Sequence, residues 1–217
     1  MEFTNFLWTS AVDVYKEILN HPFLQGVITG NLDENAFHFY IIQDIRYLQV
    51  FSSGLIHLGR KAPKYEWRFM FSEHAVDMLE MKDSFSGLLI SELGYEFEEV
   101  YQIPMAPENL LYISFLLNAA QGQSFYEALA AFLPCYWFYA KLGVELKKQG
   151  SPMYLYQQWI RSLNSPRFMS KVKNVLSIMN QVVENLSEEE KELVRRHFVT
   201  AAEFEYRFWD MAYSRRN

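Results

Sequence analysis

The sequence holds a single cysteine, Cys135, and fewer basic than acidic residues, 20 Lys and Arg against 26 Asp and Glu. One cysteine excludes an intramolecular disulfide and fits a reducing compartment. The net charge of −6 argues against a nucleic-acid-binding surface, and basic clusters such as Lys147–Lys148 are too short to make one. Any covalent chemistry through sulfur must therefore use Cys135.

Hydrophobic runs are too short for a membrane-spanning helix. The uncharged run Ala128–Ala140 falls well below the roughly 20 apolar residues that a spanning helix needs. Glu2 stands where a secretory signal peptide would carry basic residues. We expect a soluble, cytoplasmic protein that binds neither membranes nor nucleic acid.

Glycine and proline are few, with nine and seven residues in 217, and no alternating strand pattern occurs between hairpin turns. The sequence therefore predicts an all-α fold, and the absence of a linker predicts one helical-bundle domain over residues 1–217. Ser124 with Glu127 and Ser187 with Glu190 form capping boxes, which mark two helix starts. Helices are expected over residues 5–19, 33–59, 63–91, 107–122, 124–147, 165–185 and 187–214, with a short one ending near 163.

Several motifs of common enzymes are missing. The chain has no G-x-S-x-G, no P-loop and no G-x-G-x-x-G. None of the five histidines follows a glutamate by three residues, so the Glu-x-x-His signature of di-iron helix bundles is absent. His74, Asp77 and Glu80 are interpreted as a solvated charged face, and we expect no metal site.

Cys135 lies in an aromatic stretch directly after Pro134. A proline inside a helix removes one backbone hydrogen bond and bends the helix, here beside the thiol. Tyr139 follows Cys135 by four residues and therefore shares its helix face. These features suit a reactive cysteine, whereas an ordinary buried core thiol is the alternative.

Asp44 lies in an otherwise aromatic helix stripe with Tyr40, Tyr47 and Phe51, spaced i, i+4, i+7 and i+11. A carboxylate in such a stripe must pair or bind something, because burying it without a partner is costly. Asp44 is therefore a candidate ligand-binding residue. The alternatives are a solvated acid at the helix rim and a core acid paired with Arg46 or another base.

Glu205 shares a helix face with Phe208 and Trp209 near the C-terminus. A carboxylic acid among apolar side chains is suited to exchange protons near neutral pH. Glu205 is therefore a candidate acid/base. The alternative is a surface acid paired with Arg207 or Lys191.

Five segments, spread in order over nearly the whole chain, match one known family. They are HPF at residues 21–23, FYIIQDIRYL at 39–48, LPCYWFYAKLG at 133–143, YQQWI at 156–160 and EYRFWDMAY at 205–213. On these segments the chain resembles the TenA (thiaminase II) family, which works in thiamin degradation and pyrimidine salvage. The resemblance implies a haem-oxygenase-like fold and a homotetramer, and no cofactor is expected.

The resemblance also implies roles for individual residues. It makes Cys135 the nucleophile that adds to the pyrimidine ring carbon next to a ring nitrogen, and Glu205 the acid/base that protonates that nitrogen. It makes Asp44 the carboxylate that binds the aminopyrimidine. The aromatic lining of the site is matched by Tyr47, Tyr112, Tyr139 and Phe208. The implied reaction is hydrolysis of 4-amino-5-aminomethyl-2-methylpyrimidine, or of thiamin, to 4-amino-5-hydroxymethyl-2-methylpyrimidine.

One position departs from the family's pattern. Where the family often has a pocket tyrosine, this chain has Leu163. The change removes a hydrogen-bond donor, for which Asn164 and Tyr156 are the candidate replacements. A pyrimidine- or thiamin-binding protein with little catalysis is therefore an alternative function. A di-iron oxygenase on the same fold is a third hypothesis, disfavoured by the missing Glu-x-x-His.

Overall fold

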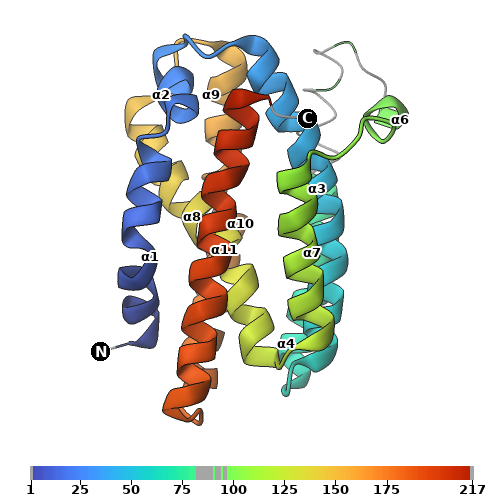
Figure 1. Cartoon of the computed structure of the whole chain (residues 1–217), viewed down its shortest axis with the longest axis vertical. Coiled ribbons are helices and arrows are strands. Elements are labelled where there is room, and N and C mark those ends of the chain that lie inside the picture. The colour runs from blue at the N-terminus through green and yellow to red at the C-terminus, as the bar shows by residue number, and fades with distance from the viewer. Residues whose placement is uncertain (1, 82–89, 91–93, 95–96, 216–217) are drawn as a thin grey trace. The chain divides into compact units, whose positions relative to one another are not determined.

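The computed structural model describes residues 2–81, 90, 94 and 97–215, and its secondary structure there is helical (Figure 1). The helices are α1 (Phe3–Leu19), α2 (Pro22–Thr29), α3 (Glu34–Lys61), α4 (Tyr65–Met81), α6 (Phe97–Val100), α7 (Pro107–Gly122), α8 (Phe125–Gln149), α9 (Tyr154–Ser162), α10 (Pro166–Val183) and α11 (Glu188–Ser214). No strand occurs among the described residues. The predicted all-α class is confirmed.

The chain groups into two compact units, and each unit is built from separate stretches of sequence. Unit 1 comprises Met1–Leu32 and Tyr126–Trp209, whereas unit 2 comprises Asp33–Phe125 and Asp210–Asn217. Unit 1 therefore holds α1, α2, α9, α10 and nearly all of α8 and α11, and unit 2 holds α3, α4, α6 and α7. The expectation of one domain stays a prediction.

The helix starts follow the local signals in the sequence. At the start of α11, the Ser187 backbone N–H donates to Glu190 Oε2 at 2.8 Å, and the Glu190 N–H donates to Ser187 Oγ at 3.2 Å. This reciprocal pair confirms the second capping box. Helix α8 begins at Phe125, directly after Ser124, as the first box predicts.

Two short helices were not expected. Pro22 opens α2 at its first position, where the missing N–H costs nothing, and His21 Nδ1 accepts from the Phe23 N–H at 3.2 Å. Helix α6 lies within a stretch that we expected to be a connection. The helix predicted over 63–91 is described as α4 only to Met81, and most of its expected remainder lies outside the described residues.

Helix α8 forms the core of unit 1. Its residues from Ala128 to Leu133 are fully buried, and the helix continues through Pro134. A helical segment that is apolar all round needs neighbours on every side, which explains why this part of α8 is buried. A bend at Pro134 stays a prediction.

In unit 2, α3 lies beside α4 and α7 (Figure 1). Most of the residues buried between them are apolar, and a buried hydrogen bond joins α3 to α4, from Ser52 Oγ to the Ala75 carbonyl oxygen at 2.8 Å. This bond satisfies a buried hydroxyl that would otherwise be costly.

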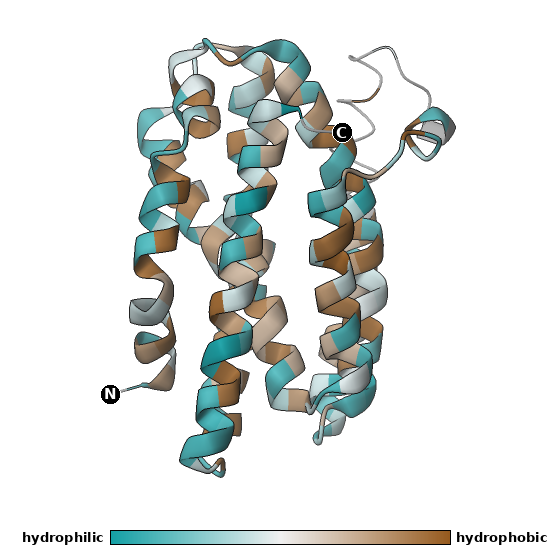
Figure 2. Cartoon of the chain, viewed as in Figure 1, coloured by the Kyte–Doolittle hydropathy of each residue, from teal (hydrophilic) through white to brown (hydrophobic). Residues whose placement is uncertain are grey.

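Hydrophilic residues gather in the first turns of α11, as Figure 2 shows, where Lys191 pairs with Glu188 at 2.7 Å. Among the described residues, no helix is sufficiently long and apolar to cross a membrane.

Candidate functional site

Cys135 lies on the buried part of α8 in unit 1, with 8% of its surface exposed. The residues three and four positions later share its face, and both contact α11. The Phe138 ring centroid lies 6.2 Å from that of Phe198, and the Tyr139 ring lies 5.7 Å from Trp209. The Cys135 face of α8 therefore packs against α11.

Glu205 is 2% exposed and lies on the stripe of α11 that these contacts define. Phe198, Ala202, Glu205 and Trp209 recur at helical spacing, so they form one line along α11. Because Phe198 and Trp209 both contact the face of α8 that carries Cys135, Glu205 lies between two contacts with that face. The structure thus brings the Cys135 and Glu205 faces together.

The alternative of Glu205 as a surface acid is wrong. Its proposed partner Arg207 is exposed and stacks over the Phe204 ring, with its guanidinium carbon 5.6 Å from the ring centroid. The other proposed partner, Lys191, pairs with Glu188. A buried carboxyl in the core of a helix bundle is an expensive arrangement, which favours a functional reason for it.

Trp209 is the centre of an aromatic cluster in unit 1. Its ring lies 5.5 Å from Phe23 of α2, 5.7 Å from Tyr139 of α8 and 6.1 Å from Trp159 of α9. The predicted residue Phe208 precedes it and is also buried. Phe23 and Trp159 were not among the predicted site residues, although both lie in the segments HPF and YQQWI that carry the resemblance.

Leu163 packs against α8 at Gly143, two turns after Cys135. A Cβ atom on Gly143 would lie 2.8 Å from the Leu163 carbonyl oxygen and 2.9 Å from its Cβ, so only glycine permits this approach. Leu163 is 7% exposed. The position lacking the family's tyrosine therefore lies in the same unit as Cys135 and Glu205, and its place in a substrate pocket stays a prediction.

Neither candidate replacement for the missing phenol has its donor to spare. Asn164 Nδ2 donates to the Gly143 carbonyl at 2.8 Å and to the Ile160 carbonyl at 2.9 Å. The Tyr156 hydroxyl donates to the Leu32 carbonyl at 3.2 Å. Both groups hold the backbone of unit 1 together, so the expectation that they compensate for Leu163 finds no support.

Asp44 lies in unit 2 on α3, and its aromatic neighbours Tyr40, Tyr47 and Phe51 are all buried. The side chain is itself only partly accessible, and burial raises the pKa of Asp44 to about 7. Among the described residues, its carboxyl group makes no hydrogen bond or ion pair. Such a group is poised to exchange a proton or to accept a ligand donor near neutral pH.

Arg46 does not neutralise Asp44, so that alternative is wrong. Its Nη1 donates instead to the carbonyl oxygens of Tyr101 at 2.7 Å and Ile103 at 2.8 Å, with Val100 at 3.4 Å. Arg46 follows Asp44 by two residues and therefore points away from its helix face. The basic group is thus used to hold the backbone before α7.

Tyr47 and Tyr112 form the aromatic wall of unit 2. Their ring centroids lie 5.1 Å apart, and Tyr47 also packs against Phe51 at 5.5 Å. Tyr47 comes from α3 and Tyr112 from α7, and both are buried. The structure therefore groups the predicted residues in two sets, Asp44, Tyr47 and Tyr112 in unit 2 and Cys135, Tyr139, Glu205 and Phe208 in unit 1.

The interpretation of His74 and Asp77 as part of a solvated charged face is wrong, because they are 3% and 6% exposed, and the side chain of Glu80 lies outside what the structure describes. Their side chains point into the packed side of α4. Over the described part of the chain, no group of three or more His, Cys, Asp or Glu side chains is arranged to hold a metal ion.

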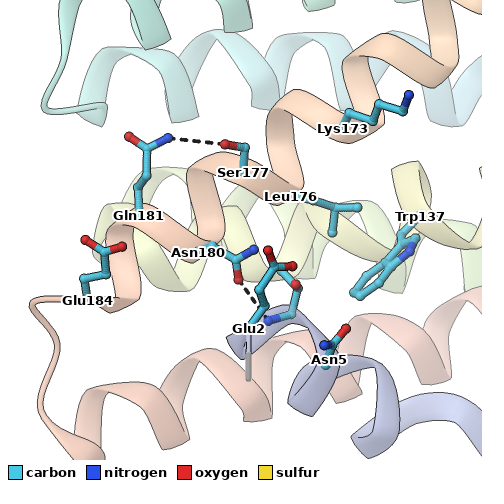
Figure 3. A pocket seen from close by; sticks show the side chains of 10 residues that line it. Glu2, Asn5, Trp137, Lys173, Leu176, Ser177, Asn180, Gln181 and Glu184 are labelled. Carbon is cyan, nitrogen blue, oxygen red and sulfur yellow. Dashed lines mark hydrogen bonds between the residues drawn. The ribbon is translucent and has the colours of Figure 1, made fainter.

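A separate groove of about 450 Å³ lies in unit 1 between the start of α1 and α10 (Figure 3). Asn180 Oδ1 accepts from the Thr4 N–H at 3.0 Å and so caps α1, and Gln181 Nε2 donates to Ser177 Oγ at 3.3 Å. Trp137 borders the groove, but none of the predicted site residues lines it. This groove is therefore distinct from the candidate site.

Comparison with known proteins identifies a matching family. Residues 8–215 match the model of the TENA/THI-4/PQQC family. A relative from Halalkalibacterium halodurans called aminopyrimidine aminohydrolase is 32% identical, covering 100% of this chain and 97% of its own. One solved structure, a TenA homologue from P. horikoshii OT3, superposes with a TM-score of 0.90 at 26% identity, covering 99% of each chain.

A more distant structure bears on the fold alone. It is a domain of unknown function with a heme oxygenase-like fold from Shewanella denitrificans, with a TM-score of 0.74 at 13% identity over 99% of this chain and 93% of that one. The expected haem-oxygenase-like arrangement of helices is thereby confirmed.

Proposed function

We propose that this chain, which belongs to the TENA/THI-4/PQQC family, hydrolyses a thiamin-related aminopyrimidine. The favoured substrate is 4-amino-5-aminomethyl-2-methylpyrimidine, which gives ammonia and the 5-hydroxymethyl product. The relative that is 32% identical to this chain is named aminopyrimidine aminohydrolase, and the similarity covers 97% of that relative. Thiamin is the second substrate, with the thiazole as leaving group.

The proposed reaction needs a nucleophile and one acid/base. The Cys135 sulfur adds to the ring carbon beside a ring nitrogen while Glu205 gives that nitrogen a proton. The protonated aminomethyl group then leaves as ammonia with the electrons of the C–N bond, while ring electrons form an exocyclic methylene. Water adds to that methylene and gives its released proton to the ammonia, the sulfur departs as thiolate, and the ring nitrogen returns its proton to Glu205. The sum is replacement of an amine by a hydroxyl, with no oxidation or reduction.

The remaining predicted residues bind the ring. Asp44 accepts hydrogen bonds from the aminopyrimidine, and the raised pKa of its carboxyl group suits a proton shared with a weakly basic ring. Tyr47, Tyr112, Tyr139 and Phe208 supply flat apolar surface, which favours a planar heterocycle over an extended substrate.

One observation carries the proposal. Glu205 is 2% exposed and lies between the two contacts of α11 with the Cys135 face of α8. A buried acid and a buried thiol on facing helices, with aromatic rings around them, support nucleophilic addition assisted by proton transfer.

A binding protein with little catalysis is the alternative, and Leu163 is the residue that favours it. Calorimetry and a product assay on the same purified chain separate the two functions. Ligand binding together with release of ammonia supports the hydrolase. Binding of the aminomethyl pyrimidine without any product, over hours and at high protein concentration, would instead support the binding protein.

Assembly into a homotetramer in the cytoplasm also belongs to the proposal. Helix α4 supports association between copies, because Tyr65, Phe69 and Val76 recur on one face and are 79%, 58% and 55% exposed. Such a row of exposed apolar residues is unusual on a monomer. Light scattering on the wild type and on Phe69→Glu tests it, and an unchanged mass of one chain for both would contradict it.

A further inference from the structure

The buried amide of Gln43 joins three parts of unit 2. Its Nε2 donates to the Pro104 carbonyl at 3.1 Å, and its Oε1 accepts from the Ala106 N–H at 2.9 Å. Asn109 Nδ2 donates to the same Oε1 at 3.0 Å and to the Gln43 backbone carbonyl at 2.9 Å. Gln43 and Asn109 are both fully buried, so α3, the chain before α7 and α7 itself meet at these two amides.

This amide pair lies one helical turn before the aromatic wall. Tyr47 follows Gln43 by four residues on α3, and Tyr112 follows Asn109 by three on α7. Each helix therefore advances by about one turn, roughly 5 Å, between the amide pair and the ring pair. A slip of α7 by one residue would rotate Tyr112 by about 100° and remove it from Tyr47.

Asn109 is not placed for stability alone. Both of its partners are acceptors, so Nδ2 must face Gln43, and Oδ1 is left buried without a hydrogen-bond partner among the described residues. A buried unpaired oxygen destabilises the fold, and an apolar side chain of the same size would avoid that cost. Polar groups kept at such a cost call for a functional reason.

We infer that Gln43 and Asn109 are positioning residues, whose buried amides hold α3 and α7 in the register that packs Tyr47 against Tyr112. The inference rests on the proposed function, in which these two rings bind the aminopyrimidine. The amides touch no substrate. They fix the wall against which the ring is held, and Arg46 assists by fastening Tyr101 and Ile103 to the same turn of α3.

The variant Asn109→Leu tests the inference because it removes the amide without leaving a new unpaired group. The Gln43 Oε1 still accepts from the Ala106 N–H. We expect the variant to fold and unfold like the wild type, with KM for the aminomethyl pyrimidine raised about tenfold and kcat changed less. A purely structural role predicts the opposite, a loss of stability with KM unchanged.

A second readout needs no substrate. In protein labelled with ¹³C on the tyrosine rings, Tyr47→Phe and Tyr112→Phe identify the two ring signals, whose shifts depend on the neighbouring ring. We expect both signals to move in Asn109→Leu. The matched control is Ser52→Ala, which removes an equally buried hydrogen bond between α3 and α4 but none to α7. If Asn109→Leu fails to fold, Asn109→Ala serves in its place.

The outcomes separate this inference from the proposed function. Unmoved tyrosine signals and an unchanged KM in Asn109→Leu, with normal turnover by the wild type, would overturn the positioning role alone. Tyrosine signals that move in Asn109→Leu, together with a wild type that neither binds nor converts the aminomethyl pyrimidine, would support the register role while contradicting the proposed function.

Discussion

The α8 segment around Cys135 is surrounded by apolar side chains, whereas α3 beside Asp44 adds buried hydrogen bonds to its apolar packing. Around Cys135, α8 is packed by aliphatic and aromatic side chains, from Ala128 through Phe138. Beside Asp44, α3 uses Gln43 and Arg46 to fasten the chain before α7. Apolar packing is non-directional, but hydrogen bonds fix one register. The first region thus suits buried chemistry, and the second suits accurate placement of a ligand.

The largest expected effect is in the apolar region. Cys135→Ala should reduce turnover of the aminomethyl pyrimidine by at least about a thousandfold, because no other thiol is present to add to the ring. Calorimetry should still detect ligand binding with an unchanged enthalpy sign. Cys135→Ser is the matched variant. Substantial turnover by either variant would contradict the role of Cys135 as the nucleophile.

Glu205→Gln comes next. The amide keeps the size of the side chain but cannot transfer a proton, so kcat should fall by about 10² to 10³. Steady-state rates across pH should also lose the limb that the wild type owes to this acid. Glu203→Gln is the control, since Glu203 is exposed on the same helix. Equal rates for the two variants would show that the buried acid has no part in catalysis.

The next prediction concerns Asp44 and the dependence of stability on pH. Its pKa is raised to about 7, so between about pH 4 and pH 7 the folded chain keeps a proton that the unfolded chain has lost. The free energy of unfolding should therefore fall as pH rises through this window. Asp44→Asn removes that loss and should be more stable than the wild type at pH 8. The difference should be roughly 2 kcal/mol, because the carboxyl is partly accessible and solvent screening reduces the stability change below what the pKa shift alone implies.

Urea titrations at pH 4 and pH 8 measure this difference. Asp13→Asn is the control, because Asp13 is an exposed acid on α1 that pairs with Lys16 at 2.8 Å. An Asp44→Asn variant whose stability follows the wild type at both pH values would mean that the carboxyl group is solvated like Asp13. The proposed difference between the two regions would then be lost.

The smallest effect lies outside both regions. Ser187→Ala removes the reciprocal cap of α11 and should lower the free energy of unfolding by about 1 kcal/mol, with kcat/KM unchanged. Thermal unfolding measures it, with the exposed Ser53→Ala as reference. A loss of activity in Ser187→Ala would show that α11 is less rigid between its start and Glu205 than its continuous helix suggests.

Much of this architecture was predictable from local signals. Capping residues, Pro107 and Pro166 marked the helix starts, and the faces of Cys135 and Glu205 followed from helical spacing. Helix α2 was missed because an eight-residue helix has little periodicity, although Pro22 was a valid sign of its start. The two alternatives that failed were pairings, of Asp44 with Arg46 and of Glu205 with Arg207. Spacing along one helix does not reveal which group a long side chain reaches, a distant carbonyl for Arg46 and a neighbouring ring for Arg207.

The amide pair of Gln43 and Asn109 was likewise beyond the sequence. Nothing in the helical pattern around either residue relates it to a position 66 residues away. Contacts of this kind depend on how helices pack, and only the tertiary structure supplies them. The roles of the site residues themselves came from the resemblance, because burial and spacing identify candidates without naming a reaction.

The most direct test is a product assay with 4-amino-5-aminomethyl-2-methylpyrimidine beside thiamin, on the wild type and on Cys135→Ala. Ammonia and the hydroxymethyl pyrimidine should appear in equal amounts with the wild type, faster than any product from thiamin, and should be absent with the variant. No product from either compound, at concentrations where both bind, would contradict the proposed hydrolase.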